Sequence, residues 1–207
     1  MHQEWLERWR IGRIGWHEDE GNACLKAYWR LRGRRVLVPL CGKTPDMKWL
    51  AEQGNHVVGV ELSRLAIEAF FVESQIDFTI RDGRLPAYQS ADEAITIYCG
   101  DYFELTEIQC DAHYDRGALI AVSPDLRPAY AAHTSSLLLP GAEQLVITLD
   151  YDQTVASGPP FSVPDEELLG YWPQLVCVDE YDDIDNAPPK FLEAGLTVLK
   201  EKVWRSP

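Results

Sequence analysis

Two runs of apolar residues near the start of the chain predict buried strands. They are RRVLVPL at residues 34–40 and HVVGVEL at residues 56–62. A near-continuous apolar run is typical of a strand that is covered on both faces of a sheet. Between and after these strands, TPDMKWLAEQ at 44–53 and the segment from Ser63 predict helices, with Gly54 ending the first. The alternation of strand and helix predicts a parallel sheet with right-handed crossovers.

The pattern of apolar residues also predicts the secondary structure of the neighbouring segments. Residues 4–9 and 22–31 predict helices, and glycines at 12, 15 and 21 predict a loop between them. After Ser63, the residues Leu65, Ala66, Ala69 and Phe70 follow the stripe of an amphipathic helix. FTIRDGRLPAY, residues 78–88, contains the Asp-Gly signal of a hairpin.

The second half of the chain predicts further strands and two helices. The strands are AITIYCGDYF at 94–103, AHYDRGALIAV at 112–122 and EQLVITLDY at 143–151, and the helices cover 124–139 and 165–171. QLVCVDEY at 174–181 and LTVLKEKVW at 196–204 predict a terminal antiparallel pair. Without the hairpin, this makes seven core strands in an α/β sheet.

Composition sets limits on the function. The chain has 207 residues and a formal net charge of −14, which opposes nucleic acid as a partner. No apolar run approaches the length of a membrane span, and the first residues do not resemble a signal peptide. Five cysteines without a C-x-x-C pair indicate reduced thiols in a cytoplasmic protein and oppose a zinc site, so no metal is expected.

VLVPLCGKT, residues 36–44, ends like a phosphate-binding loop. Such a loop needs a glycine five positions before Gly42, and that position holds Leu37 in the predicted strand. The three-glycine fingerprint of dinucleotide-binding folds is also missing. We therefore expect Thr44 to cap the following helix with Pro45 at its first position, rather than a phosphate site.

Three features are expected to meet at the carboxyl ends of the parallel strands, where ligands bind in open sheets. Gly42 allows close approach of a ligand to the backbone. Glu61 ends the second strand, 19 residues later (61 − 42), and its carboxylate can accept both ribose hydroxyls. Asp101 follows the next strand and can accept from an adenine amino group, while Tyr102 can cover the ring. Each feature alone could be structural, but their order favours a nucleoside site.

The segments VLVPLCGKTPDMKWLAEQGNHVVGVELSRLAIEAFF and YDRGALIAVSPDLRPAYA resemble the thiopurine S-methyltransferase family. GRIGWHEDEGN near the start and the GPPFSVP loop are similar to that family as well, so the resemblance covers nearly the whole chain. It implies a Rossmann-like class I methyltransferase fold, with a seven-stranded mostly parallel sheet, a terminal antiparallel strand and helices on both faces. Residues 1–207 would form one domain, with residues 1–32 as a helical cap over the cofactor site.

The resemblance also implies an activity, which is methyl transfer from S-adenosylmethionine (SAM) to the sulfur of small aromatic or heterocyclic thiols. Selenium and tellurium compounds are further acceptors that it suggests, and a monomer is expected. The family's cofactor positions match Trp9, Leu40, Glu61, Asp101, Tyr102 and Arg116. Trp16 stands where the family often has phenylalanine, and residues 83–94 differ in length and sequence among relatives, which leaves acceptor preference open.

These residues have definite roles in the expected chemistry. Trp9 can attract the sulfonium through its ring, unless it only anchors the first helix. Arg116 can stabilise an anionic sulfur, and Asp115 can orient it or act as a weak base, although buried acids at strand ends are commonly structural. A lid made of the first helix and the GPPFSVP loop is a further hypothesis. The alternatives are a non-catalytic SAM-binding sensor or partner protein, a nucleoside triphosphate enzyme and a dehydrogenase.

Overall fold

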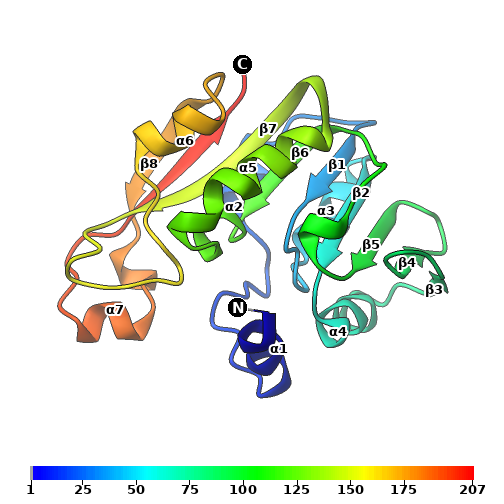
Figure 1. Cartoon of the computed structure of the whole chain (residues 1–207), viewed down its shortest axis with the longest axis horizontal. Coiled ribbons are helices and arrows are strands. Elements are labelled where there is room, and N and C mark those ends of the chain that lie inside the picture. The colour runs from blue at the N-terminus through cyan, green and yellow to red at the C-terminus, as the bar shows by residue number, and fades with distance from the viewer. Residues whose placement is uncertain (1) are drawn as a thin grey trace. The chain divides into compact units, whose positions relative to one another are not determined.

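The structure is a computed structural model that describes residues 2–207. It divides into two compact units, a first that ends at Ala112 and a second from His113 to Pro207. Figure 1 shows the helices and strands of the chain. Among the described residues there are nine strands, two more than the seven core strands predicted, because β3 and β4 form the hairpin that the Asp-Gly signal predicted. No helix within residues 2–207 is both long and apolar enough to cross a membrane.

The first unit is built on five strands in the order β3-β4-β5-β2-β1. Their bounds are β1 Arg35–Val38, β2 His56–Glu61, β3 Phe78–Arg81, β4 Ala87–Ser90 and β5 Ile95–Cys99. β2 runs parallel to both β1 and β5, whereas β4 is antiparallel to β3 and β5. The carboxyl ends of β1, β2 and β5 therefore meet at one edge, as the sequence predicted.

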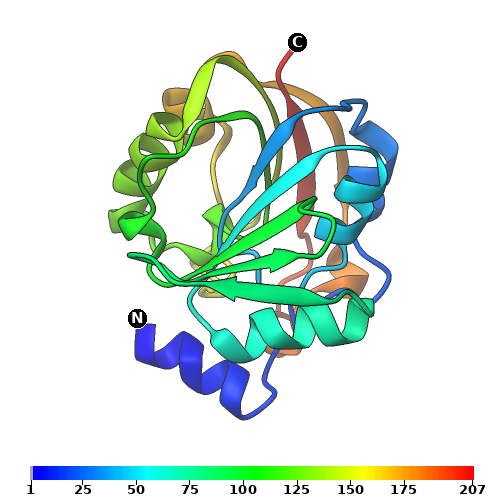
Figure 2. The same cartoon turned by 90° about the vertical axis from the view of Figure 1, so that its right-hand side faces the viewer.

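Helices of the first unit are α1 His2–Arg10, α2 Ala23–Tyr28, α3 Asp46–Glu52 and α4 Arg64–Ser74. Side chains pack closely over Gly59 of β2, since a Cβ there would lie 2.9 Å from Cys41 Sγ and 3.2 Å from Sδ of Met47 on α3. Asn22 caps α2 through a hydrogen bond from the Leu25 amide. α1 lies beside α4 in both views (Figures 1 and 2).

Two details of these helices differ from the sequence prediction. α3 begins at Asp46 with Pro45 as its cap residue, one position later than expected, and Thr44 Oγ1 accepts from the Asp46 amide at 3.3 Å. Ser63 caps α4 as predicted, but Leu65 is 56% exposed, so its place in the buried stripe was wrong. The face of α4 that packs inward carries Ala66, Ile67, Phe70 and Phe71.

The second unit contains three antiparallel strands in the order β7-β9-β8, with bounds β7 Leu138–Asp150, β8 Val176–Asp182 and β9 Lys200–Arg205. β6, Cys110–Arg116, leads into it. Its α-helices are α5 Arg127–Ser136, α6 Asp165–Tyr171 and α7 Pro189–Glu193, and its short 3₁₀ turns are η2 Leu119–Ala121, η3 Pro124–Leu126 and η4 Ile184–Asn186. The antiparallel pairing of β8 with β9 confirms the predicted terminal pair.

Two elements of the second unit were not predicted with these bounds. The helix expected over residues 124–139 is a 3₁₀ turn followed by α5, which ends at Ser136, and β7 begins at Leu138. α7 was not predicted at all. Phe191 of α7 is fully buried against Tyr151, with their ring centroids 4.8 Å apart. Because this contact joins residues far apart in the sequence, no local sequence pattern predicts it.

Candidate functional site

The turn after β1 is the first part of the candidate site. Leu40 has a φ of 46° and Gly42 a φ of 54°, so both adopt a left-handed conformation that costs a leucine on the order of 1–2 kcal/mol. The Cys41 amide donates to the Val60 carbonyl at 2.9 Å, which fixes the turn against β2. Strain of this kind is retained where the backbone must face a ligand or a neighbouring element.

Glu61 lies at the centre of this part of the site. Its side chain is buried at the end of β2, with 6% exposure. Oε2 accepts from the Gly42 amide at 2.9 Å, and Oε1 accepts from the Ser63 amide at 2.7 Å. Burial raises the pKa of Glu61 to about 7, against the opposing effect of the amides of Ser63, Gly42 and Leu62. Each oxygen keeps one lone pair, so the carboxylate can still accept from two hydroxyl groups.

Trp9 of α1 lies over the same turn. A Cβ added at Gly42 would approach the Trp9 ring to 3.1 Å, so a larger residue would push against the indole in addition to the strain of the positive φ. Trp9 and Trp5 each make an edge contact with Trp16, at centroid distances of 5.8 and 5.2 Å. These three rings are half-buried. The first helix is therefore held above Gly42 by a tryptophan cluster.

Lys43 forms an ion pair with Glu73. Its Nζ lies 2.7 and 2.8 Å from the two carboxylate oxygens of Glu73 on α4. This pair explains the Gly-Lys-Thr sequence without a phosphate, because the ammonium joins the turn to the next helix. The neighbouring Cys41 is buried, and burial followed by the charge of Glu61 raises the pKa of its thiol. A buried thiol with a raised pKa is a poor nucleophile.

Asp101 follows β5 on the same edge of the sheet. Its Oδ1 accepts from the Phe103 amide at 3.0 Å, and Oδ2 lies 3.4 Å from His2 Nε2 at the start of α1. The amide of Gly100 donates to the Glu61 carbonyl at 3.0 Å, which fixes the Asp101 turn beside β2. Tyr102 is buried, with 3% exposure, whereas Phe103 is 40% exposed. Neither Phe103 nor the contact of His2 with Asp101 was predicted from the sequence.

Asp115 and Arg116 belong to the second unit, at the end of β6. Asp115 is fully buried, its Oδ1 accepts from the Leu119 amide at 3.1 Å and its Oδ2 accepts from the Tyr130 hydroxyl at 2.7 Å. Burial raises the pKa of Asp115 to about 6, while the hydrogen bond from Tyr130 and the amides of Leu119 and Ala118 act against the shift. Asp115 thus holds the turn that follows Arg116, and Arg116 itself is half-buried.

His113, two residues before Asp115, is a buried residue that was not predicted from the sequence. It is fully buried, its Nδ1 lies 3.1 Å from Gln144 Nε2, and its Nε2 lies 3.9 Å from Asp115 Oδ2. Burial lowers the pKa of His113 to about 3, so the imidazole is neutral at physiological pH. Every residue of β6 from Ala112 to Asp115 is buried, so no alternation along the strand marks His113.

The predicted residues fall into two groups. Trp9, Leu40, Gly42, Glu61, Asp101 and Tyr102 belong to the first unit, at the carboxyl ends of β1, β2 and β5, whereas Asp115 and Arg116 belong to the second. A separate cavity of about 390 Å³ has Arg35 and His56 in its lining, which begin β1 and β2. It contains none of the predicted residues, so the strand carboxyl ends remain the candidate site.

Comparison with known proteins identifies close relatives. The family model described as Thiopurine S-methyltransferase (TPMT) matches residues 1–206. The thiopurine S-methyltransferase of Bordetella petrii is 46% identical, over 97% of this chain and 95% of its own length. That of Pseudomonas syringae pv. tomato is 45% identical, over 99% and 97%.

Solved structures match the fold at lower identity. A Burkholderia thailandensis 1,6-didemethyltoxoflavin-N1-methyltransferase with bound S-adenosylhomocysteine matches with a TM-score of 0.64 and 19% identity, covering 99% of this chain and 86% of that one. A TehB-like SAM-dependent methyltransferase from Corynebacterium glutamicum matches with a TM-score of 0.55 and 15% identity, covering 100% and 98%. These likenesses confirm the predicted class I methyltransferase fold.

Proposed function

Because the chain belongs to the thiopurine S-methyltransferase family and is a SAM-dependent methyltransferase, we propose that it methylates the sulfur of small aromatic or heterocyclic thiols. Thiopurine-like heterocycles are the central acceptor class, and selenium or tellurium compounds are further soft acceptors. The observation that carries the proposal is the match to relatives named for this reaction, at 42–46% identity over 97–99% of the chain.

The cofactor site of this proposal lies at the carboxyl ends of β1, β2 and β5 in the first unit. Glu61 supports it most directly, because a buried carboxylate whose oxygens each retain a lone pair suits the two hydroxyls of a ribose. Gly42 and the strained Leu40 turn bring the backbone close to the ligand. The Phe103 amide uses one lone pair of the Asp101 carboxylate, and the remaining lone pairs can accept a hydrogen bond from the adenine amino group.

Trp9 and Tyr102 complete the proposed cofactor contacts. The half-buried ring of Trp9 above Gly42 attracts the sulfonium by a cation–π interaction of about 1–2 kcal/mol when the site is desolvated. The ring of Tyr102 is buried and presents little surface, so its contribution is the shape of the Asp101 turn. The exposed ring of Phe103 is better placed to cover an adenine.

Arg116 is the proposed group for the acceptor. When bound, SAM supplies an activated methyl group. The protein then has to align the acceptor sulfur with that methyl group and to favour its thiolate form. The guanidinium of Arg116 stabilises the negative charge of that sulfur or its heterocycle. Asp115 contributes by holding the Arg116 turn through the Leu119 amide and Tyr130, and a role as weak base is the other reading of its raised pKa.

The organisation of the chain is part of the same proposal. Residues 1–207 act as one methyltransferase domain, in which residues 1–32 cap the cofactor site. The contact of Trp9 with Gly42 and that of His2 with Asp101 support the cap, since both join α1 to the strand edge. A cytoplasmic monomer that binds no nucleic acid agrees with the net charge of −14.

A panel of thiols tests the function directly. The protein is incubated with SAM and with thiopurines, thiophenols, aliphatic thiols and matched phenols, and S-adenosylhomocysteine release is measured. We expect turnover of the heteroaromatic thiols and little of the phenols, because sulfur is the softer and more acidic nucleophile. Arg116→Ala should lower kcat/KM by at least tenfold for acceptors that react as anions, with Arg205→Ala, an exposed arginine at the end of β9 in the second unit, as control. Methylation of the phenols alone would contradict a thiol acceptor.

A further inference from the structure

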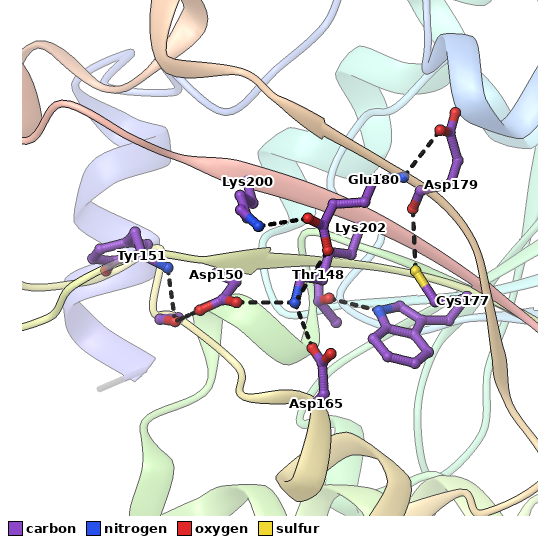
Figure 3. Close-up of polar contacts among 11 residues, drawn as sticks. Thr148, Asp150, Tyr151, Asp165, Cys177, Asp179, Glu180, Lys200 and Lys202 are labelled. Atoms are coloured by element: carbon purple, nitrogen blue, oxygen red, sulfur yellow. Dashed lines mark hydrogen bonds and ion pairs between the residues drawn. The ribbon is translucent and has the colours of Figure 1, made fainter.

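One ammonium group joins both ends of the segment between β7 and α6, residues 151–164. Asp150 is the last residue of β7 and Asp165 the first of α6. Lys202 Nζ lies 2.9 Å from Asp150 Oδ2 and 2.7 Å from Asp165 Oδ1, and Glu180 Oε2 lies 3.4 Å away on its other side. Figure 3 shows Lys202 between these carboxylates, and only 5% of the residue is exposed. The buried ammonium of Lys202, paired with three carboxylates, therefore holds the two ends of the segment together.

The segment is also fixed along its length. The Tyr151 amide donates to Ser162 Oγ at 3.1 Å, and the Tyr151 hydroxyl donates to the Pro160 carbonyl at 2.6 Å. Lys190 of α7 donates to the carbonyls of Ser157 and Pro159 at 3.0 and 2.8 Å. These bonds use backbone groups that a mobile lid would leave to solvent.

Arg127 connects the segment to the turn that follows Arg116. It is 1% exposed, its Nε donates to the Val122 carbonyl at 3.2 Å and an Nη donates to the Ser162 carbonyl at 3.0 Å. The Phe161 amide donates to the Ile120 carbonyl at 2.7 Å, four residues beyond Arg116. The half-buried ring of Phe161 packs against Gly158, where a Cβ would come within 2.3 Å of it. Phe161 is thus held next to the Arg116 turn.

We propose that Lys202 is a positioning residue which, with Arg127, keeps residues 151–164 as a preformed wall beside Arg116, so that Phe161 sets the shape offered to the methyl acceptor. This inference rests on the proposed acceptor role of Arg116. It replaces the lid hypothesis for this segment, because a wall anchored at its base, middle and tip is in place before substrate arrives. A preformed wall binds the acceptor without the entropy of ordering a loop.

Charge balance explains why Lys202 matters more to this wall than its neighbour. Burial opposes the charge of Lys202, yet the hydrogen bonds that it donates to Asp165 and Asp150 raise its pKa, so the ammonium stays charged at any physiological pH. Without it, Asp150 and Asp165 would repel each other across the base of the segment. Lys200, on the same strand, lies opposite Asp150 in the β7–β9 ladder, but its ammonium pairs with Glu180 at 2.6 Å (Figure 3). Among residues 2–207, that ammonium lies within 4 Å of neither the Asp150 nor the Asp165 carboxylate.

This difference provides a matched pair of variants, Lys202→Met and Lys200→Met. For Lys202→Met we expect the KM for the thiol to rise at least tenfold and amide exchange over residues 152–161 to become faster. The Kd for S-adenosylhomocysteine should stay within twofold, because the proposed cofactor residues other than Arg116 lie in the first unit. Lys202→Arg should restore the KM to within about threefold, and Lys200→Met should leave every value unchanged.

The opposite results are equally definite. A lower Tm for Lys202→Met with unchanged KM and unchanged exchange would make Lys202 a stabilising residue only and would overturn the proposal. If that variant does not fold, Asp165→Asn keeps Lys202 and Asp150 paired, and we expect faster exchange near residues 161–164 with a smaller rise in KM. Failure of the wild type to methylate any thiol would reject the proposed function, while slow exchange over residues 152–161 would still identify a rigid segment.

Discussion

Glu61 is the residue on which the proposed cofactor site depends most. Replacing it with alanine removes a carboxylate that would accept two hydroxyl hydrogen bonds, each charge-assisted bond being worth about 1.5–3 kcal/mol. We expect the Kd for S-adenosylhomocysteine to rise at least tenfold in Glu61→Ala, since a tenfold change corresponds to about 1.4 kcal/mol. Calorimetric titration measures it. Glu68→Ala is the control, because Glu68 on α4 pairs with the exposed Arg64 of the same helix and with no other basic residue among residues 2–207. Equal affinity in wild type and Glu61→Ala would remove Glu61 from the site.

The pKa of Glu61 also makes binding sensitive to pH. Burial raises it to about 7, so the folded protein without ligand holds a proton that the unfolded chain has released above its ordinary pKa of 4.5. Stability of the ligand-free protein should therefore fall as the pH rises from about 4.5 to 7. A ribose diol binds the ionised form, so affinity for S-adenosylhomocysteine should increase from pH 6 to pH 8.

The measurement is the shift in Tm caused by saturating S-adenosylhomocysteine at each pH. We expect a larger shift at pH 8 than at pH 6, and a Glu61→Ala variant should lose this difference. Burial also raises the pKa of Asp115, to about 6, and Glu61→Ala separates the effect of Glu61 from that of Asp115 because it leaves Asp115 in place. A shift that is larger at pH 6 would contradict the proposed role of the ionised carboxylate.

Asp115 offers a test between a positioning and a basic role. Asparagine can still accept from the Leu119 amide, and its amide group can donate to the Tyr130 oxygen, so the turn after Arg116 should survive. We expect Asp115→Asn to keep kcat within about threefold, whereas loss of a general base typically costs 10²–10⁴-fold. Initial rates with a heterocyclic thiol decide the matter, and Asp115→Ala should be less stable because two buried donors lose their acceptor. A hundredfold loss in Asp115→Asn would identify the base.

For single residues, the sequence predicted where a side chain lies along the sheet better than which side chains it contacts. Gly42, Glu61 and Asp101 were found because strand ends and glycine turns have a definite place in a parallel sheet. The approach of His2 to Asp101 and the burial of His113 depend on tertiary packing, which leaves no local signal. The buried ring of Tyr102 and the exposed ring of Phe103 follow from the 3₁₀ turn at Tyr102–Glu104, and the sequence pattern does not show which of two adjacent aromatic residues faces inward.

The first helix is the element expected to respond to the cofactor. α1 contains no buried residue, and its contacts with the strand edge include the Trp9 ring over Gly42 and the partly exposed pair of His2 with Asp101. A helix without a buried residue opens more easily than the core, and a ligand beneath Trp9 would add to its contacts. We expect slower amide exchange over residues 2–20 when S-adenosylhomocysteine is bound, with residues 152–161 unchanged. Equal protection of residues 2–20 in both states would count against a cap.

Strong periodicity explains which elements were predicted. β1 and β2 have apolar residues on both faces, and Ser63 and Gly54 mark helix ends by their own chemistry. The errors lie where two patterns overlap. On α4, Leu65 and Ile67 compete for the buried face, and packing against the sheet buries Ile67 and leaves Leu65 exposed. After α5, the apolar run Leu137–Leu139 continues a helical pattern but belongs partly to β7.

For the whole molecule, the acidic surface predicts a monomer. The chain has 33 acidic and 19 basic residues, and its copies repel each other at moderate salt. β8 is the last strand in the order of the second unit, and its exposed Val176 and Val178 would favour pairing between copies. Asp179 and Glu180 on the same strand oppose it, as charges do on natural edge strands.

Light scattering at low and high salt tests this balance. We expect the wild type to keep the mass of a single chain, 23.5 kDa, in both conditions, because the side chain of Asp179 carries a local charge in addition to the long-range repulsion. Asp179→Val leaves the long-range repulsion but lengthens the apolar edge, so it should associate only when salt screens the remaining charge. A wild type that dimerises at low salt would contradict repulsion as the cause, and a variant that stays monomeric at high salt would show that the Val176–Val178 edge is too short to pair.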